Sequence, residues 1–325
     1  MNSGDPRAGC GGCATNGSAI KTATMVRMVR LGFLIQFICA IGMLAHADAL
    51  DERIRATVEG FQGNVFLFAK NLDSGATYGL RPDEPVRTAS TIKLPILAAT
   101  FQAVAEGKIK WTDFTTLRKE DKVSGSGILG EFADDSRFTL ADVAHLMIVL
   151  SDNTATNLVL DKITADYVND YLDTLRLTRT RSMRKVRGDG ADLKSPTGFS
   201  RAGRIPENER FGLGSSTPRE MVTLLEKIER REIVSKEASD EILKVLRRQQ
   251  DRNGIARRMG TTPVANKAGA LERLRSDVGI VYSKGGRIAI AITCDDMPAS
   301  DWSSDNPGLL MIARLSEILV AGLAK

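Results

Sequence analysis

The sequence predicts an α/β (α+β) fold in two parts, in which one antiparallel sheet is built from both ends of the chain. Strand-like patterns occur at residues 64–80 and 264–293, whereas residues 101–260 between them mostly have the period of helices. We therefore expect a sheet flanked by helices, with a mostly helical inserted domain. An active site is expected in the cleft between the two parts.

The first 47 residues have the pattern of a signal peptide. A basic flank at residues 25–30 precedes an apolar run at residues 31–44, and Ala45-His46-Ala47 fits a small-residue cleavage site. The apolar run is too short for a comfortable membrane span. We expect a secreted or periplasmic protein, with an uncleaved membrane anchor as the alternative.

The remaining residues, 48–325, are expected to form one catalytic domain. Its α/β part comprises residues 48–89 and 261–325, and its mainly helical part comprises residues 90–260. The α/β part begins with an amphipathic helix and the two strands of residues 64–80. In the helical part, Thr139-Leu-Ala-Asp142 matches a capping box that opens a helix.

The last quarter of the chain changes from helical to strand period. Strands are expected at residues 264–268, 278–282 and 287–293, and Lys284-Gly285-Gly286 predicts a hairpin turn between the last two. A closing amphipathic helix is expected at residues 306–324.

Composition excludes several classes of function. The chain has 42% hydrophobic and 26% charged residues, which is ordinary for a folded protein. Much of its net charge of +5 lies in the targeting segment, so we expect no nucleic-acid partner. The exported part keeps one cysteine, Cys294, and one histidine, His145, so we expect no disulfide, no metal site and no cofactor.

The scarcity of histidine also limits the catalytic options. His145 lies in an apolar helical run, where a core histidine is the simpler interpretation. A serine hydrolase without a spare histidine needs another base, and lysine is the usual substitute. Ser90 and Lys93 have that pattern, because two residues three apart share one face of a helix. The non-catalytic alternative is that Ser90 caps the helix and Lys93 extends its amine to solvent.

A long irregular stretch, residues 176–216, follows the first helices. Structureless segments of this length inside a domain are usually functional. It begins with basic residues, which favour a solvated surface, with attraction of an anionic substrate as the alternative. These residues are Arg176, Arg179, Arg181, Arg184, Lys185 and Arg187.

Three motifs occur in order: Ser90-x-x-Lys93, Ser151-Asp152-Asn153 and Lys267-Ala268-Gly269. Each lies at an expected element boundary, where side chains can converge on a cleft. In order and spacing they resemble the motif set of the penicillin-recognising serine enzymes, and of the class A β-lactamases most closely. The resemblance covers roughly residues 50–325.

The resemblance implies a role for each residue. Ser90 attacks an amide carbonyl, Lys93 takes its proton, and Ser151 with Lys267 protonates the leaving nitrogen. Asn153 holds the substrate amide, and the N–H groups of Ser90 and Ala270, beside Gly269, form the oxyanion hole. Lys267 and an arginine hold the substrate carboxylate. The expected arginine is Arg275, with Arg273 as the alternative.

Two departures from the family pattern affect these expectations. Ala268 replaces a threonine or serine, so a hydroxyl that would bind the substrate carboxylate is missing. No glutamate occurs near Thr197-Gly198-Phe199, where the water-activating residue of class A enzymes is expected. Asp189 and Asp192 are the alternatives for the water-activating residue. Glu207 and Glu209 lie beyond the expected position, and we expect them to anchor the loop instead.

Three hypotheses therefore compete. The leading one is an exported, monomeric class A β-lactamase-like hydrolase that opens β-lactams through an acyl-Ser90 intermediate and so provides antibiotic resistance. The second is a D-alanyl-D-alanine carboxypeptidase or related peptidoglycan amide hydrolase with slow deacylation, as the missing glutamate suggests. The third is a non-catalytic cell-wall or ligand-binding module. The expected partner is a β-lactam or a D-Ala-D-Ala-type peptide, and a membrane is involved only through an uncleaved signal segment.

Overall fold

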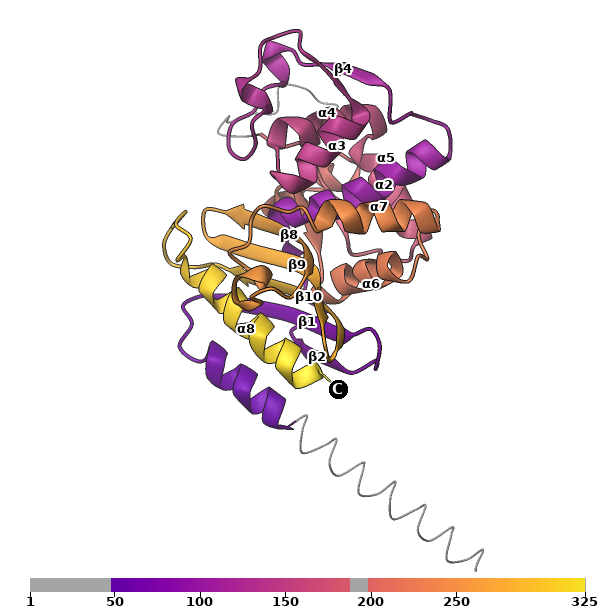
Figure 1. Cartoon of the computed structure of the whole chain (residues 1–325). Helices are drawn as coiled ribbons and strands as arrows, with labels where there is room; N and C mark the ends of the chain where they lie inside the picture. The colour runs from indigo at the N-terminus through magenta and orange to yellow at the C-terminus, as the bar shows by residue number, and fades with distance from the viewer. Residues whose placement is uncertain (1–47, 188–197, 325) are drawn as a thin grey trace, which may run out of the picture. The chain divides into compact units, whose positions relative to one another are not determined.

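A five-stranded antiparallel sheet forms one layer of the computed structural model, and strands from both halves of the chain build it (Figure 1). The strand order is β2-β1-β10-β9-β8, so two early strands lie beside three late ones. This arrangement confirms the predicted sheet. Its strands are β1 (Asn64–Asn71), β2 (Thr77–Leu80), β8 (Val264–Leu271), β9 (Leu274–Ser283) and β10 (Gly286–Asp295).

The structure describes residues 48–187 and 198–324, and residues from Glu52 onward form one compact unit. The predicted signal peptide lies outside the described residues. Within the described ranges, no helix is both long enough and apolar enough to cross a membrane.

Two helices cover the two faces of the sheet. Alternate residues of a strand point to opposite faces, and residues 288–292 of β10 are all buried. Ala289 and Ala291 belong to the core cluster that includes α6 (Pro218–Glu229). Ile288, Ile290 and Ile292 alternate with these alanines and therefore face the other side, where α8 (Pro307–Leu323) packs on β9 and β10.

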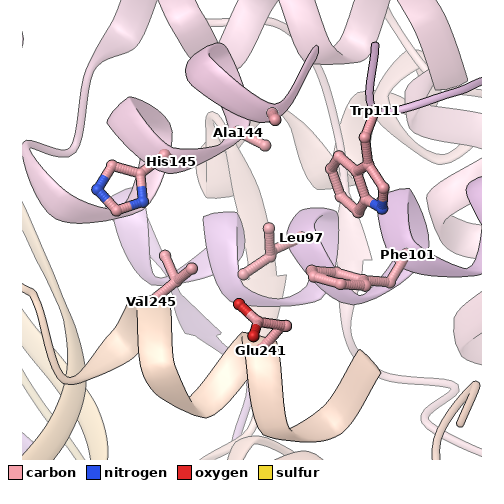
Figure 2. Close-up of a pocket in the computed structure, with 8 residues that line it drawn as sticks. Leu97, Phe101, Trp111, Ala144, His145, Glu241 and Val245 are labelled. Carbon is pink, nitrogen blue, oxygen red and sulfur yellow. The ribbon is translucent and has the colours of Figure 1, made fainter. Parts of the chain in front are cut away.

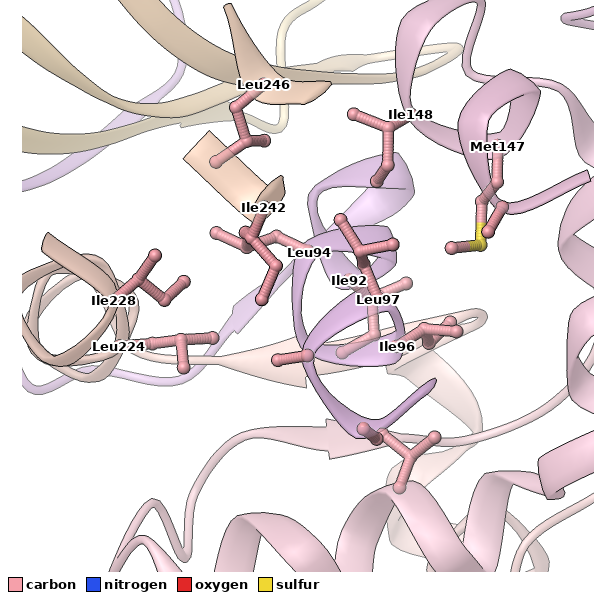
Figure 3. Close-up of a cluster of buried hydrophobic side chains, with 14 of the residues drawn as sticks. Ile92, Leu94, Ile96, Leu97, Met147, Ile148, Leu224, Ile228, Ile242 and Leu246 are labelled. Carbon is pink, nitrogen blue, oxygen red and sulfur yellow. The ribbon is translucent and has the colours of Figure 1, made fainter. Parts of the chain in front are cut away.

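The helical part is organised around α2 (Lys93–Ala105), which is buried along most of its length. Isoleucine and leucine side chains of α2 share one continuous core with apolar side chains of α3, α6 and α7 (Figure 3). Because α2 has no polar face, this packing rather than amphipathicity holds it in place. The other helices here are α3 (Leu140–Val149), α4 (Asn153–Ile163), α5 (Ala165–Thr174) and α7 (Lys236–Leu246).

The helical part also contains two small sheets that the sequence did not predict. One pairs β4 (Phe114–Thr116) with β5 (Arg137–Thr139), and the other has the order β3-β7-β6. The second sheet joins β3 (Val86–Arg87), β6 (Arg181–Ser182) and β7 (Gly214–Ser216). These strands have two or three residues each, too short to give a periodic pattern, and β6 and β7 lie near the two ends of the stretch expected to be irregular.

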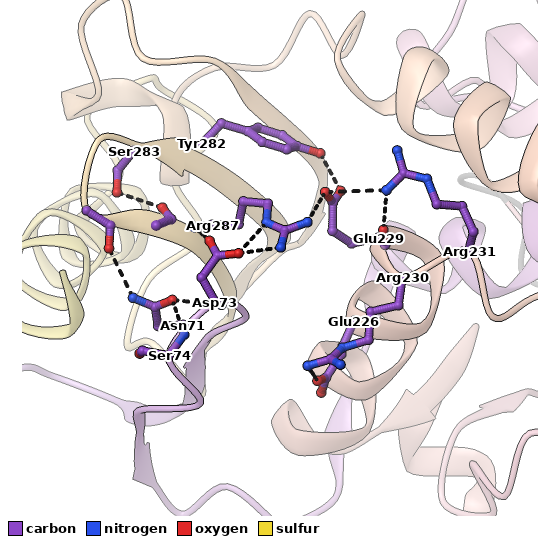
Figure 4. Close-up of polar contacts among 12 residues, drawn as sticks. Asn71, Asp73, Ser74, Glu226, Glu229, Arg230, Arg231, Tyr282, Ser283 and Arg287 are labelled. Atoms are coloured by element: carbon purple, nitrogen blue, oxygen red, sulfur yellow. Dashed lines mark hydrogen bonds and ion pairs between the residues drawn. The ribbon is translucent and has the colours of Figure 1, made fainter. Parts of the chain in front are cut away.

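A polar network ties α6 to the sheet (Figure 4). The Glu229 carboxylate, at the end of α6, accepts hydrogen bonds from the Tyr282 hydroxyl at 2.8 Å and from Arg287 at 3.1 Å. Arg287 also binds Asp73, in the turn after β1, and this contact lowers the pKa of Asp73. Glu229 is buried, so its bonds to β9 and β10 hold the helix against the sheet.

We expect Glu229→Ala to lower the free energy of unfolding by about 1–3 kcal/mol, because the Tyr282 hydroxyl and Arg287 lose their shared acceptor. Urea unfolding followed by circular dichroism measures the change. Glu232→Ala, at an exposed position nearby, is the matched control and should change stability by less than about 0.5 kcal/mol. Equal effects of the two substitutions would contradict the role given to Glu229.

Candidate active site

Ser90 lies in a 3₁₀ turn, Ala89–Ile92, that leads directly into α2. The sequence placed Ser90 and Lys93 on one helix. In the structure Lys93 is instead the first residue of α2, after the 3₁₀ turn. Residues three apart eclipse each other in a 3₁₀ turn, so the expected shared face is kept. Ala89 has a φ of 48°, an unfavourable value for a residue with a side chain, which indicates strain at the start of the turn.

The Lys93 amine is fully buried and surrounded by neutral oxygen atoms. Its Nζ lies 2.6 Å from the Ser151 carbonyl oxygen and 2.9 Å from Asn153 Oδ1. Burial, and then the charge of Lys267, lower the pKa of Lys93 well below its ordinary value. A neutral amine has two N–H groups, which these two oxygens accept. Its lone pair then remains available to take a proton.

Ser151 connects the two lysines. Its Oγ accepts a hydrogen bond from Lys267 Nζ at 2.9 Å and lies 3.3 Å from Lys93 Nζ. Ser151 has a φ of 55°, so the chain turns sharply between α3 and α4 to direct this hydroxyl. Burial lowers the pKa of Lys267 to about 8, although the charges of Asp277 and Asp251 oppose the shift. Two ammonium groups around one hydroxyl repel each other, which favours a neutral Lys93 beside a charged Lys267.

Asp152 has a structural role that the sequence reasoning did not assign. Its buried carboxylate caps α4 by accepting the Ala155 N–H at 2.7 Å. It also accepts the N–H groups of Ile128 and Leu129 at 2.7 and 2.9 Å. An added Cβ on Gly127 would lie 2.2 Å from this carboxyl, so the loop needs glycine there.

Asn153 joins the same loop to Lys93. Its Oδ1 accepts from Lys93, and its Nδ2 donates to the Ser124 carbonyl at 3.0 Å. Residues 123–127 are therefore held against the site. The Asn153 side-chain amide, which the family resemblance assigns to substrate binding, therefore already has one partner at its oxygen and one at its nitrogen.

Strand β8 approaches the Ser90 turn closely because Gly269 has no side chain. A Cβ there would lie 2.9 Å from the Thr88 oxygen and 3.0 Å from the Ser90 nitrogen. β8 is an edge strand that pairs only with β9 among the described strands. The backbone N–H of Tyr282 in β9 donates to the Pro263 carbonyl oxygen, so odd-numbered residues here face β9. The even-numbered residues of β8 therefore direct their N–H groups away from β9. The Ala270 N–H therefore points out from the free edge of β8, the side on which the oxyanion hole was predicted.

A cleft of about 1220 Å³ contains these groups. Ser90, Ser151 and Lys267 line it, and Lys93 lies beneath them. Asn153, Ala268, Gly269 and Ala270 also line it, and Ala268 presents a methyl group.

The structure corrects the expected position of Arg275. This side chain does not line the cleft, because its guanidinium donates to the carbonyl oxygens of Leu271 and Leu274, each at 2.6 Å. It also lies under the ring of Trp302, 4.8 Å from the ring centroid. Arg273, the alternative, does line the cleft. Trp302 lines it too, with 65% of its surface exposed, and no sequence motif marked it.

The cleft wall formed by the long connecting segment has no carboxylate among its described residues. Val186 occupies this wall, and Asn157 clamps its peptide with two hydrogen bonds, at 2.8 and 2.9 Å. Glu207 and Glu209 do not line the cleft, and Asp189 and Asp192 lie outside the described residues.

His145 is away from this cleft. It is half-buried and lines a separate cavity of about 280 Å³ with Leu97, Trp111 and Glu241 (Figure 2). It is therefore a cavity residue rather than the core histidine expected from its apolar run. Burial, and the nearby charge of Arg248, lower its pKa. A base at Ser90 must come from another residue, which leaves Lys93.

A serine in the turn that opens a buried helix, a buried lysine beside it and a second serine–lysine pair at the sheet edge are the arrangement typical of penicillin-recognising serine enzymes. The family model described as "Beta-lactamase enzyme family" matches residues 49–323. The chain belongs to this family.

Known proteins agree with this placement. A β-lactamase of Serratia marcescens, SME-1, is 31% identical over 36% of this chain, and the match covers 41% of that relative. The β-lactamase regulatory protein BlaB of Streptomyces cacaoi is 25% identical over 84% of this chain and 97% of its own length.

Two solved structures have similar folds. A β-lactamase from Sphaerobacter thermophilus has a TM-score of 0.71 and 27% identity, covering 84% of this chain and 96% of that one. A mutant of PBP-A, solved as its acyl-enzyme complex with penicillin-G, has a TM-score of 0.70 and 27% identity, with the same coverage.

The charges of the two lysines give an expected pH dependence. The rate at which benzylpenicillin acylates the protein should fall as pH rises through about 8, because Lys267 then loses the positive charge with which it donates to Ser151. Acylation is measured by intact-protein mass spectrometry from pH 5 to 10, with circular dichroism at each pH as the control for folding. A rate that keeps rising to pH 10 would contradict a required Lys267 ammonium.

Proposed function

We propose that this protein is an exported serine hydrolase that recognises β-lactams and opens their amide through an acyl-Ser90 intermediate. The observation that carries the proposal is the buried Lys93 amine, held by the Ser151 carbonyl and Asn153 one helical turn from Ser90. Its low pKa suits it to take the Ser90 proton. The acylated mutant of PBP-A supports the same chemistry here.

The geometry also supports a route for the second proton transfer. When the ring nitrogen leaves, Ser151 Oγ gives it a proton and takes one from Lys267 or Lys93, which lie 2.9 and 3.3 Å away. The Ser90 and Ala270 N–H groups stabilise the oxyanion, and each such donor typically contributes about 3 kcal/mol. No metal or cofactor is assigned a step.

A second candidate function is a D-alanyl-D-alanine peptidase that releases its acyl group slowly. The wall that contains Val186 favours it, because no described residue there can activate water. The two candidates share acylation and differ in deacylation. Ala268 bears on both, because a lost hydrogen bond to a substrate carboxylate costs about 1.5–3 kcal/mol.

The site groups have the same use in either case, so the non-catalytic alternative has less support. A pure binding module has no need for a buried, neutral lysine, which costs stability. Export rests on the pattern of residues 1–47, and a periplasmic or secreted location remains part of the proposal.

Intact-protein mass spectrometry with benzylpenicillin tests the proposal. We expect the protein to gain the mass of one penicillin on Ser90, and Ser90→Ala to gain none. Ser124→Ala, which changes another serine lining the cleft, is the matched control and should still be acylated. Absence of both an adduct and any hydrolysis of benzylpenicillin at millimolar concentration would refute the proposal.

Val186→Glu should shorten the life of this adduct. Val186 lines the cleft with Ser90, and the Asn157 clamp holds its peptide in place, so a carboxylate there can reach a water beside the acyl group. A positioned general base typically raises a reaction rate by at least about 100-fold. Because the carboxylate is added to a site that did not hold one, we expect the deacylation rate to rise by about tenfold or more.

Val186→Gln is the control, because it has the same size without a base. The decay of the adduct mass after removal of free penicillin gives the rate. Equal lifetimes for the Glu and Gln variants would show that this position does not serve deacylation.

A further inference from the structure

Three arginines gather on one side of the cleft. Strands β6 and β7 are antiparallel, and the Met183 N–H donates to the Leu213 oxygen at 3.0 Å. This pairing brings Arg184, just after β6, beside Gly212, just before β7. A Cβ on Gly212 would lie 3.6 Å from a guanidinium nitrogen of Arg184. We call Arg184, Arg187 and Arg210 the arginine wall, and all three line the cleft of Ser90.

Within the described residues, the arginine wall has little charge compensation. Neighbouring basic residues are paired: Arg181 with Asp173, and Lys185 with Asp161. Among residues 48–187 and 198–324, no carboxylate forms an ion pair within 4.0 Å of the three wall guanidinium groups. Burial, and then the charge of Arg187, lower the pKa of Arg184 to about 10.

The donors of the wall are also partly unused. The Nε of Arg187 is buried and has no hydrogen-bond partner in the described part of the chain. Arg184 donates to the Lys185 oxygen, and Arg210 lies over the Phe211 ring. Guanidinium groups brought together without counter-charges cost stability, so such an arrangement suits a site where an anion binds.

Apart from Arg87, which is paired with Asp295, the positive charge that lines the cleft lies in two regions. Lys267 and Arg273 form one, where the family resemblance places the carboxylate next to the scissile amide. The arginine wall is the other. The acidic residues that line the cleft, Asp251, Glu272 and Asp296, come from segments outside the wall. A substrate with one negative charge would leave one of these two regions without a bound anion.

We propose that the arginine wall is a second anion subsite, so that the preferred substrate of Ser90 carries an additional carboxylate on its acyl side chain. Guanidinium groups bind carboxylates through paired N–H donors, which gives orientation as well as affinity. The inference rests on the proposed function, because it needs an acyl group on Ser90 whose side chain reaches the wall.

Two penicillins that differ by one carboxylate test the inference: benzylpenicillin and its α-carboxy derivative. The second-order rate of acylation of the full chain is measured for each by mass spectrometry. We expect the dicarboxylate to react about tenfold faster at low salt, the effect of one charge-assisted contact. The ratio should shrink at 0.5 M salt, roughly, as exposed charges are screened.

Arg184→Gln and Arg210→Gln should each reduce this ratio, and the double variant should bring it close to one. Arg210 is exposed, so its variant is expected to fold even where Arg184→Gln does not. Arg314→Gln is the control, because it removes one exposed positive charge on α8, outside the cleft, and should keep the ratio.

The outcomes separate the two proposals. A ratio of one in the unaltered protein, or a ratio that survives in the double variant, would overturn the anion subsite while leaving the acyl-Ser90 chemistry in place. Absence of both an adduct and hydrolysis with either penicillin would instead overturn the proposed function itself.

Discussion

The burial of the Lys93 amine is the constraint on which the rest of the site depends. A charged lysine inside a protein is costly, so the amine is driven toward its neutral form. The free-energy cost of burying the amine is reduced by two hydrogen-bond acceptors, the Ser151 carbonyl oxygen at 2.6 Å and Asn153 Oδ1 at 2.9 Å. The site therefore exists only while the turn between α3 and α4 holds these oxygens in place.

Several features that make no contact with a substrate maintain that turn. Asp152 binds three backbone N–H groups and fixes the start of α4 against the loop at residues 127–129. Gly269 lets β8 approach the Ser90 turn, so that the sheet and the helical part share one site. Strain at Ala89 and Ser151, both with positive φ, is balanced by this packing.

The charge of the cleft is divided in a way that suits a specific substrate. Lys267 and the arginine wall supply positive charge from different elements, whereas Arg275 is occupied by backbone carbonyl groups. Val186, with no acid beside it among the described residues, makes acylation easier to explain than release. The balance of the two steps distinguishes a β-lactamase from a slow penicillin-binding hydrolase on the same fold.

The large sheet and the main helices could be predicted from the sequence, and the motifs single out Ser90, Lys93, Ser151 and Lys267 as candidate site residues. These follow from local periodicity and from motifs with fixed spacing, which a linear pattern can carry. Which arginines reach the cleft could not be predicted, because the pairing of strands and the path of the loops set the direction of each side chain. Arg275 is therefore sequestered while Arg184 and Arg210 line the cleft, and no spacing rule distinguishes them.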